Sequence, residues 1–142
     1  MAESLMWKDL KKVSDADMTR HEDKLNLGIP DVSYGLDGVN GWIELKQYDR
    51  WPSDPQEPLP FRNLKPLQRR FLRKRGRAGG HCFILLRVGN KRKDYEFYLI
   101  SWKHVTLLGE LTREEIGEKC VHAWKEWMEP NIDHYLCKNM HE

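Results

Sequence analysis

Glu44 and Lys46 lie two residues apart in an apolar stretch, residues 41–47, and Asp31 precedes Glu44 by thirteen residues. Side chains on a β-strand alternate between its two faces, so Glu44 and Lys46 are expected to point the same way. Ile43 and Leu45 then point to the opposite face of the sheet. One strand would therefore present a carboxylate and an ammonium group to the same cleft.

Asp31 is expected to lie close to this pair. It follows Pro30, which has no amide hydrogen and fits the first position of a strand. Asp31 would then open the neighbouring strand of a hairpin that continues to Glu44. Two carboxylates would therefore converge where one edge of the sheet ends.

Two carboxylates beside a lysine suit the metal-assisted hydrolysis of a phosphodiester. A cation neutralises charge in the transition state and lowers the pKa of the attacking water. Mg²⁺ prefers oxygen ligands and takes only one or two carboxylates from a protein, and we expect Mn²⁺ to substitute for it. The predicted metal ligands are Asp31, Glu44 and the backbone carbonyl of Leu45. Lys46 would hold or help deprotonate the water and stabilise the developing negative charge.

These residues resemble the signature of the PD-(D/E)XK nuclease superfamily, nearest to its small virus-type replication-repair (VRR-NUC) and Holliday-junction-resolvase-like members. The resemblance rests on residues 28–31, residues 44–46 and Gln68, and it covers roughly residues 18–101. It implies that Glu22, on a preceding helix, adds a carboxylate to the catalytic site. It also implies that Gln68 supports the site or the scissile phosphate, and that the substrate is DNA.

Residues 62–77 are strongly basic, although the formal net charge of the whole chain is only +2. A helix is expected over residues 65–75, with Leu67, Phe71 and Leu72 on its buried side. A basic helix face without acids can follow a phosphate backbone, so this stretch predicts salt-dependent binding to nucleic acid. Its eight basic residues are Arg62, Lys65, Arg69, Arg70, Arg73, Lys74, Arg75 and Arg77, of which Arg69, Arg70, Arg73 and Lys74 are expected across the exposed side.

Hydrophobic periodicity and turn residues predict the other elements. The loop over residues 48–63 is proline-rich and could carry substrate specificity. The apolar side of the helix expected at residues 112–128 packs either in the core or against a partner. Helices are expected at residues 3–12, 15–25 and 112–128, and strands at residues 32–34, 42–46, 81–88 and 95–101.

This order of elements defines an α/β domain with a mixed central β-sheet flanked by helices. The resemblance implies a restriction-endonuclease-like core. A chain of 142 residues fits one domain with a sizeable core. We expect a single nuclease domain over residues 1–142, with its core at about 15–108 and a C-terminal helical extension at about 110–142.

Cys120, His122, His134 and Cys137 offer a rival metal site, because cysteine and histidine are the usual ligands of structural zinc. Residues two apart on a helix point about 200° apart, so Cys120 and His122 cannot easily share one ion. Packing of Cys120 in the core is the favoured alternative.

The composition also bears on where the protein acts. No run approaches the ~18 apolar residues that a membrane span needs, and the first residues lack a basic start followed by an apolar stretch. Three cysteines, an odd number, favour reduced thiols over a disulfide framework. We expect no membrane partner and a cytoplasmic location, which is the host cytoplasm if the chain is viral.

Three functions remain open on this basis. The leading one is a Mg²⁺-dependent endonuclease acting on branched or otherwise structured DNA in recombination or repair. The second is a restriction-type or repair nuclease with the same site but a duplex, nicked or end substrate. The third is a non-catalytic nucleic-acid-binding module. The two carboxylates argue against it, because a binding module has no need to keep two like charges in one cleft. Junction-cleaving relatives act as dimers, so the first function is compatible with a homodimer.

Overall fold

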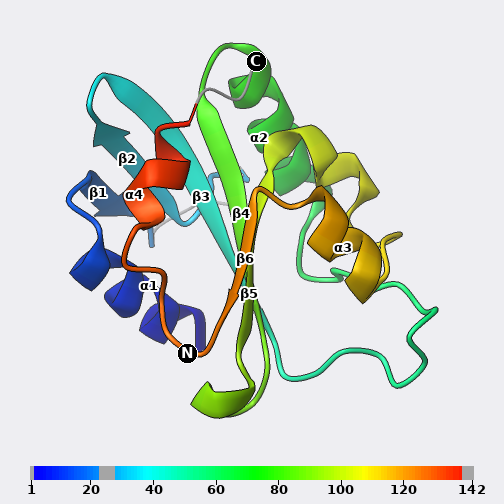
Figure 1. Cartoon of the computed structure of the whole chain (residues 1–142). Helices are drawn as coiled ribbons and strands as arrows, with labels where there is room; N and C mark the ends of the chain where they lie inside the picture. The colour runs from blue at the N-terminus through cyan, green and yellow to red at the C-terminus, as the bar shows by residue number, and fades with distance from the viewer. Residues whose placement is uncertain (1, 23–27, 139–142) are drawn as a thin grey trace.

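The centre of the protein is a mixed β-sheet, seen in a computed structural model that describes residues 2–22 and 28–138. Over these residues the sheet has six strands, which lie side by side in chain order (Figure 1). Neighbouring strands are antiparallel except β3 and β4, which are parallel. The strands are β1 (Asp17–Arg20), β2 (Val32–Leu36), β3 (Val39–Tyr48), β4 (His81–Val88), β5 (Glu96–Ser101) and β6 (His122–Lys125).

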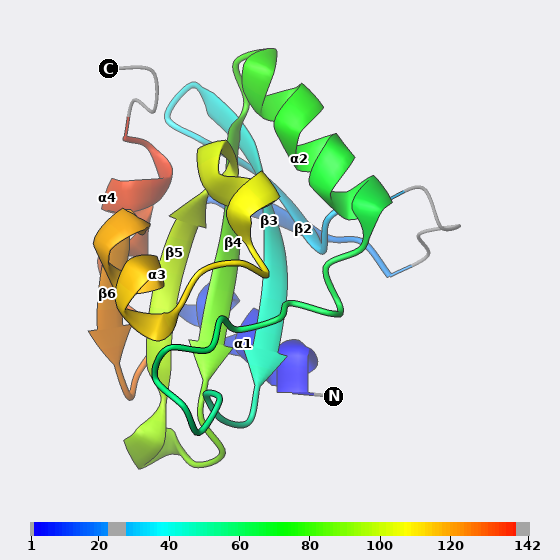
Figure 2. The ribbon, with the colours of Figure 1, turned by 90° about the vertical axis from the view of Figure 1, so that its right-hand side faces the viewer.

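Helices cover both faces of this sheet (Figures 1 and 2). Two α-helices, α1 (Ala2–Val13) and α4 (Ile132–Leu136), lie on one face, and α2 (Pro66–Arg77) and α3 (Arg113–Lys119) lie on the other. Short 3₁₀ helices are η1 (Arg92–Asp94) and η2 (Trp102–Leu107). None of the helices within residues 2–22 and 28–138 has the length and apolar character needed to span a membrane. The predicted α/β architecture with a mixed central sheet is confirmed, and it is consistent with a restriction-endonuclease-like core.

Each face of the sheet has its own hydrophobic core. The α1-side core includes Met6, Leu10, Ile43, Leu45, Phe83, Leu85, Ile132 and Leu136. The α2-side core includes Leu72, Cys82, Ile84, Leu86, Val105 and Ile116. Because β4 supplies alternate residues to both cores, it is buried along almost its whole length, as the apolar run over residues 81–88 predicts.

The alternation of β3 decides which way the candidate catalytic residues point. Ile43 and Leu45 belong to the α1-side core. Glu44 and Lys46 therefore share the opposite face, as the sequence predicts, and this is the face that α2 covers (Figure 1). In the parallel register with β4, Glu44 lies opposite Ile84 and Lys46 lies opposite Leu86.

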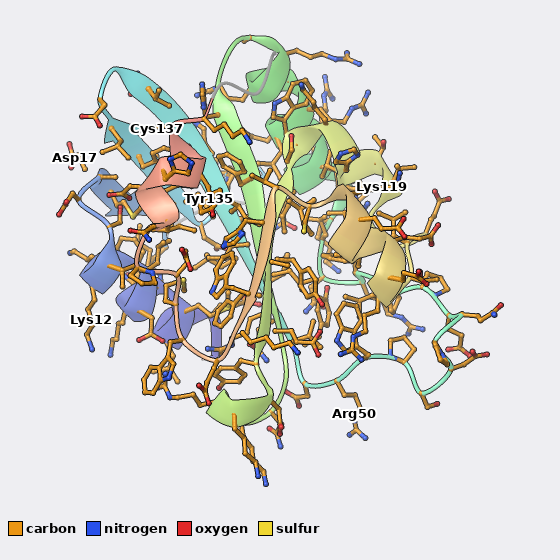
Figure 3. All side chains as sticks on the ribbon, in the orientation of Figure 1. Lys12, Asp17, Arg50, Lys119, Tyr135 and Cys137 are labelled. Carbon is orange, nitrogen blue, oxygen red and sulfur yellow. The ribbon has the colours of Figure 1, made fainter. Side chains whose placement is uncertain are left out.

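A long crossover joins the parallel strands β3 and β4, as such a pair requires. Its first part is the predicted proline-rich loop, which is packed against the protein rather than fully exposed. Leu59 and Phe61 are buried in the α2-side core, and the backbone N–H of Leu59 donates to the carbonyl oxygen of Leu111 at 3.0 Å. Arg50, near the start of the loop, extends away from the body of the protein (Figure 3).

The helix predicted over residues 15–25 is wrong for the residues that the structure describes there. Residues Asp17–Arg20 form β1, which pairs with β2. Met18 packs against the α1-side core, whereas Asp17 and Thr19 are exposed, so burial alternates as in a strand. Pairing with β2 thus overrides the helical pattern. Residues 23–27 lie outside the described residues.

The helix predicted over residues 112–128 is only partly correct. Thr112 caps α3 by accepting from the backbone N–H of Glu115 at 3.2 Å, and the side chain of Glu115 accepts from the backbone N–H of Thr112 at 2.9 Å, which forms a capping box. The helix ends at Lys119, and the next residues form β6, which pairs with β5. Trp124 stacks on Phe97 at 5.2 Å between ring centroids, so its apolar surface packs in a strand rather than on a helix.

Two helical glycines give a matched test of how α2 is docked. A Cβ on Gly76 of α2 would lie 2.2 Å from the Trp102 ring, whereas a Cβ on Gly117 of α3 meets only an ordinary contact at 4.0 Å. We expect Gly76→Ala to lower the free energy of unfolding by about 1–3 kcal/mol through overpacking. Gly117→Ala should raise it by up to about 1 kcal/mol, because alanine favours helix. Urea unfolding of both variants measures this, and equal effects would contradict the close α2–Trp102 contact.

Candidate active site

Glu44 and Lys46 form an ion pair that is almost completely shielded from water. Glu44 is 1% exposed and Lys46 is 4% exposed. Lys46 Nζ lies 3.1 Å from Glu44 Oε2. Charged side chains are rarely this buried unless they are paired, so β3 carries a feature that the core alone does not need.

Asp31 is held against the same part of β3 by its own backbone and side chain. Its backbone N–H donates to Glu44 Oε1 at 3.2 Å. Its Oδ2 accepts from the backbone N–H of Leu45 at 2.8 Å. Asp31 directly precedes β2, so the β2–β3 pairing brings the two predicted carboxylates together, as the sequence indicates.

Gln68 connects Glu44 to the start of α2. Its Nε2 donates to Glu44 Oε2 at 3.1 Å, while its Oε1 accepts from the backbone N–H of Lys65 at 2.8 Å. The second bond belongs to the cap at the N-terminus of α2, where Pro66 is the first helical residue. Both ends of the amide are therefore fixed, and the orientation of Glu44 depends on how α2 begins.

Lys46 is tied to the crossover as well as to Glu44. Its Nζ donates to the backbone carbonyl of Asn63 at 2.9 Å. The sequence does not single out Asn63, because a backbone carbonyl carries no residue-specific signal and the contact depends on the path of the loop. Two of the three donor hydrogens of the ammonium group thus have identified acceptors, Asn63 and Glu44.

Glu22 lies in a different environment from the one expected. Its side chain is 77% exposed, and its Oε1 lies 3.8 Å from Arg20 Nη1. The helix that was expected to carry it is replaced by β1. Among the described residues no three His, Cys, Asp or Glu side chains gather into a metal-holding group, so Glu22 does not join Asp31 and Glu44 in one.

The oxygen ligands of Asp31 and Glu44 suit a hard cation, whereas the predicted zinc ligands, all of them described residues, do not form a metal site. Asp31 and Glu44 supply two carboxylates, the number that a protein typically gives to Mg²⁺. Within residues 2–22 and 28–138, no three His, Cys, Asp or Glu side chains gather closely enough to hold a metal ion. All four predicted zinc ligands, Cys120, His122, His134 and Cys137, fall in this range, so the zinc alternative is wrong.

The basic stretch divides into structural and exposed residues. Arg69 is structural: its guanidinium donates to the carbonyl oxygens of Leu64, Val105 and Leu108, and burial lowers its pKa. Leu67, expected on the buried side, is instead 50% exposed. Both differences arise because α2 packs on η2 through Leu72 and Gly76, which rotates the buried side away from Leu67.

The remaining basic side chains of α2 gather on its outer side. Arg70, Arg73, Lys74 and Arg77 line a hollow of about 420 Å³. The other basic residues of the stretch, Arg62, Lys65 and Arg75, are also exposed. The helix that orients Glu44 therefore also presents a concave cationic surface, as expected for most of the predicted residues but not for Arg69.

Comparisons with known proteins do not assign the chain to a family. No family model matches it, and no curated protein matches it. Among solved structures, it is similar to Hjc, a Holliday junction resolvase from the archaeal hyperthermophile Archaeoglobus fulgidus. The identity is 18%, the match covers 68% of this chain and 73% of that chain, and the TM-score is 0.37. A TM-score of this size is too low to define the family.

A double-mutant cycle tests whether the buried pair is energetically coupled. Lys46→Met should lower the free energy of unfolding by about 3–5 kcal/mol, because it leaves Glu44 buried without a cation. Adding Glu44→Gln should recover part of this loss, with a coupling energy of about 1–3 kcal/mol in urea unfolding.

The pair Glu96 and Arg113 provides the matched control. Its N–O distance is 2.5 Å, but Arg113 is 54% exposed. The cycle Glu96→Gln with Arg113→Met should give a coupling of less than about 1 kcal/mol. Additive effects of Glu44→Gln and Lys46→Met would contradict the buried ion pair.

Proposed function

We propose that this protein is a metal-dependent endonuclease of the PD-(D/E)XK type that hydrolyses phosphodiester bonds in DNA. The observation that carries the proposal is the buried contact between Glu44 and Lys46, joined by hydrogen bonds to Asp31 and Gln68. Core packing alone does not require these four polar groups to meet. Their arrangement brings together two carboxylates, an ammonium group and an amide at one end of β3.

Asp31, Glu44 and the backbone carbonyl of Leu45 are the residues that would hold Mg²⁺, with Mn²⁺ as a substitute. When bound, the cation supplies charge neutralisation and acidified water for the hydrolysis. Lys46 points into the same site and is fixed by the carbonyl of Asn63. Its ammonium group is placed to orient the attacking water and to stabilise negative charge on the phosphate oxygens.

Gln68 acts as a positioning residue in this proposal. One end of its amide is held by the cap of α2 and the other holds Glu44 Oε2. A carboxylate fixed in this way has fewer rotamers to lose when it binds a cation. Glu22 is not included in the proposed catalytic set, since its side chain is largely in water.

The outer side of α2 supports DNA as the substrate. Arg70, Arg73, Lys74 and Arg77 form a cationic hollow, and the same helix supplies Gln68 to the site. A strand bound along α2 through its phosphates would be guided toward Glu44. We also propose that its relatives are the VRR-NUC and Holliday-junction-resolvase-like nucleases, and that its substrate is branched or otherwise structured DNA. A homodimer would allow two strands of one junction to be cut.

Cleavage assays test the proposed site directly. Labelled four-way junction, flap, plain duplex and single-stranded DNA are incubated with Mg²⁺, Mn²⁺ or EDTA. We expect metal-dependent cutting by the wild type, and a rate at least about 100-fold lower for Glu44→Ala and Lys46→Ala. DNA binding in EDTA should remain, because it rests on the exposed cations of α2 and not on Glu44 or Lys46.

Glu110→Ala and Lys119→Ala are the matched controls, since both residues are exposed. They should cut at the wild-type rate. Cutting by Lys46→Ala at that rate would refute the site. Salt-sensitive binding without cutting under any metal would favour a non-catalytic binding module, and preference for plain duplex would favour a restriction-type or repair nuclease.

The salt dependence of binding separates the two kinds of arginine on α2. Arg70→Ala and Lys74→Ala should each reduce the slope of log Kd against log salt by about 1, as loss of one phosphate contact predicts. Arg69→Ala should leave the slope unchanged and instead lower the melting temperature, because three carbonyl oxygens lose their donor. A lower slope for Arg69→Ala alone would contradict this division.

A further inference from the structure

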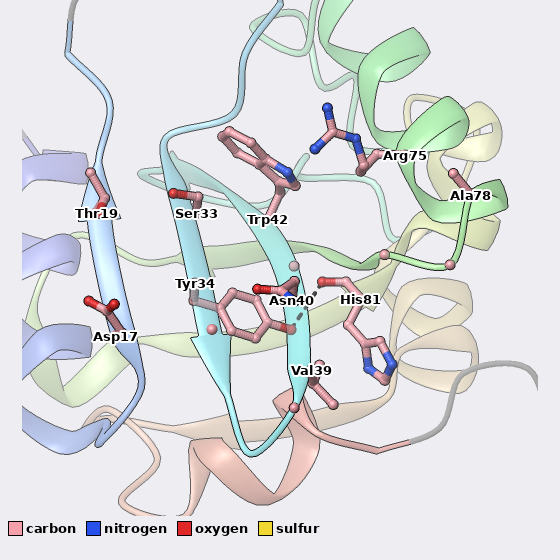
Figure 4. Close-up of a pocket in the computed structure, with 15 residues that line it drawn as sticks. Asp17, Thr19, Ser33, Tyr34, Val39, Asn40, Trp42, Arg75, Ala78 and His81 are labelled. Carbon is pink, nitrogen blue, oxygen red and sulfur yellow. Dashed lines mark hydrogen bonds between the residues drawn. The ribbon is translucent and has the colours of Figure 1, made fainter.

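A second hollow lies on the α2 side of the sheet, beyond the catalytic residues (Figure 4). Its volume is about 730 Å³. Its floor is formed by the beginning of β3 with β2 and β1, and the C-terminal end of α2 with the following glycines forms one wall (Figure 4). The residues on which the inference depends are Asp17, Thr19, Ser33, Asn40, Trp42 and Arg75.

The hollow and the proposed active site lie on the same face of the sheet, as the strand register shows. Trp42 lies two residues before Glu44 on β3, so both side chains are on the same face. Ser33 lies opposite Trp42, and Thr19 lies opposite Ser33. The next row along the strands places Asn40 opposite Gly35. The hollow therefore begins one residue pair along β3 from Glu44.

The floor of the hollow is polar and mostly uncharged. Thr19 and Asn40 are exposed and Ser33 is half-buried, so hydroxyl and amide groups face the space. Such groups donate and accept hydrogen bonds in the patterns that the edges of nucleobases present. Asp17 is the one acid among the lining residues, and it lies at the outer strand β1.

Trp42 places an aromatic ring and a cation together at the inner end of the hollow. The guanidinium of Arg75 lies 5.5 Å from the centroid of the Trp42 ring. His21 lies 5.0 Å from the same ring on a tilted plane, and Phe71 contacts it edge-on at 5.0 Å. Trp42 is therefore held in one orientation by its neighbours while remaining partly exposed.

We propose that this hollow binds an unpaired nucleotide of the DNA strand that flanks the scissile phosphate. The nucleobase contacts Trp42 and Arg75, and its edge faces Thr19, Ser33 and Asn40. Aromatic rings beside basic side chains are the usual platform for single-stranded nucleic acid, because every base can stack. This inference rests on the proposed nuclease function and narrows its substrate to DNA with unpaired nucleotides next to a duplex, such as a flap.

The dimensions favour an unpaired strand over a duplex. A hollow of about 730 Å³ lies in the range of ~300–1,000 Å³ of sites that enclose small organic ligands, which suits one or two nucleotides. A duplex keeps its bases stacked inside and offers only its backbone and grooves to a protein surface. The base of an unpaired nucleotide can instead reach the ring of Trp42.

Equilibrium binding in EDTA tests the hollow without relying on catalysis. Fluorescence anisotropy compares three labelled DNAs: a single strand, a flap and a blunt duplex. Wild-type protein should bind the flap and the single strand more tightly than the duplex. Trp42→Leu should weaken flap and single-strand binding by about fivefold or more, as loss of one base–aromatic contact predicts. Asn40→Asp should weaken both by about threefold or more, because it replaces an amide that faces the base edge by a negative charge, which repels the polyanionic strand.

Each variant has a matched control elsewhere on the surface. Trp127→Leu removes a tryptophan that is 60% exposed and also carries an arginine, Arg92, at 3.9 Å from its ring. Gln56→Glu adds the same charge as Asn40→Asp on the exposed loop. Neither control should change the preference for unpaired DNA. Thermal melting checks that Trp42→Leu is folded. If Trp42→Leu does not fold, Asn40→Asp alone tests the hollow.

The possible outcomes separate this inference from the proposed function. Loss of the flap preference in Asn40→Asp, with duplex binding unchanged, supports the hollow even if the wild type cuts no DNA. A second outcome is that the protein cuts DNA and needs Glu44 to do so, while Trp42→Leu and Asn40→Asp bind the flap as tightly as the wild type. This outcome overturns nucleotide binding in the hollow but leaves the proposed nuclease function standing. Equal weakening of flap and duplex binding also overturns nucleotide binding in the hollow, as does a wild type that binds none of the three DNAs.

Discussion

Two opposite charges, Glu44 and Lys46, are almost completely removed from water on the face of β3 that α2 covers. Burying either charge alone would cost several kcal/mol, so each requires the other and further polar partners. Those partners come from separate parts of the chain: the backbone of Asp31 before β2, the carbonyl of Asn63 in the loop and the amide of Gln68 on α2. The need to satisfy one buried ion pair thus fixes how four segments meet.

The helix α2 links this site to the rest of the protein. Gln68 donates to Glu44, and Gly76 allows the Trp102 ring to approach closely. Arg69 donates to the carbonyl oxygens of Val105 in η2 and of Leu108 directly after it. The outer side carries the exposed cations. The orientation of Glu44, the packing on η2 and the exposed cations therefore depend on one twelve-residue helix. The rotation of this helix about its axis is set by the contact between Gly76 and Trp102.

Much of this arrangement could be predicted from local pattern, and the exceptions have physical causes. The alternation in residues 41–47 correctly placed Glu44 and Lys46 on one face. Pro30 predicted that Asp31 opens the strand that pairs with β3, and that strand, β2, begins one residue later at Val32. Arg69 could not be distinguished from Arg70, because both are adjacent basic residues and only the position of η2 decides which is enclosed. Residues 17–20 and 122–125 formed strands because β2 and β5 offer edges for pairing, an influence that a helical period does not contain.

The parallel pairing of β3 and β4 also has a consequence for the order of folding. These strands can join only after the loop and α2 have crossed the sheet, so the contact is non-local and its closure entropy must be overcome late. Gln68 and Asn63 belong to that crossover. A nascent or partly folded chain with only the β1–β3 meander would hold Asp31 and Glu44 without the groups that orient Glu44 and Lys46. Under the proposed nuclease function, the site would be complete only after this crossover has formed, so a partly folded chain would not cut nucleic acid.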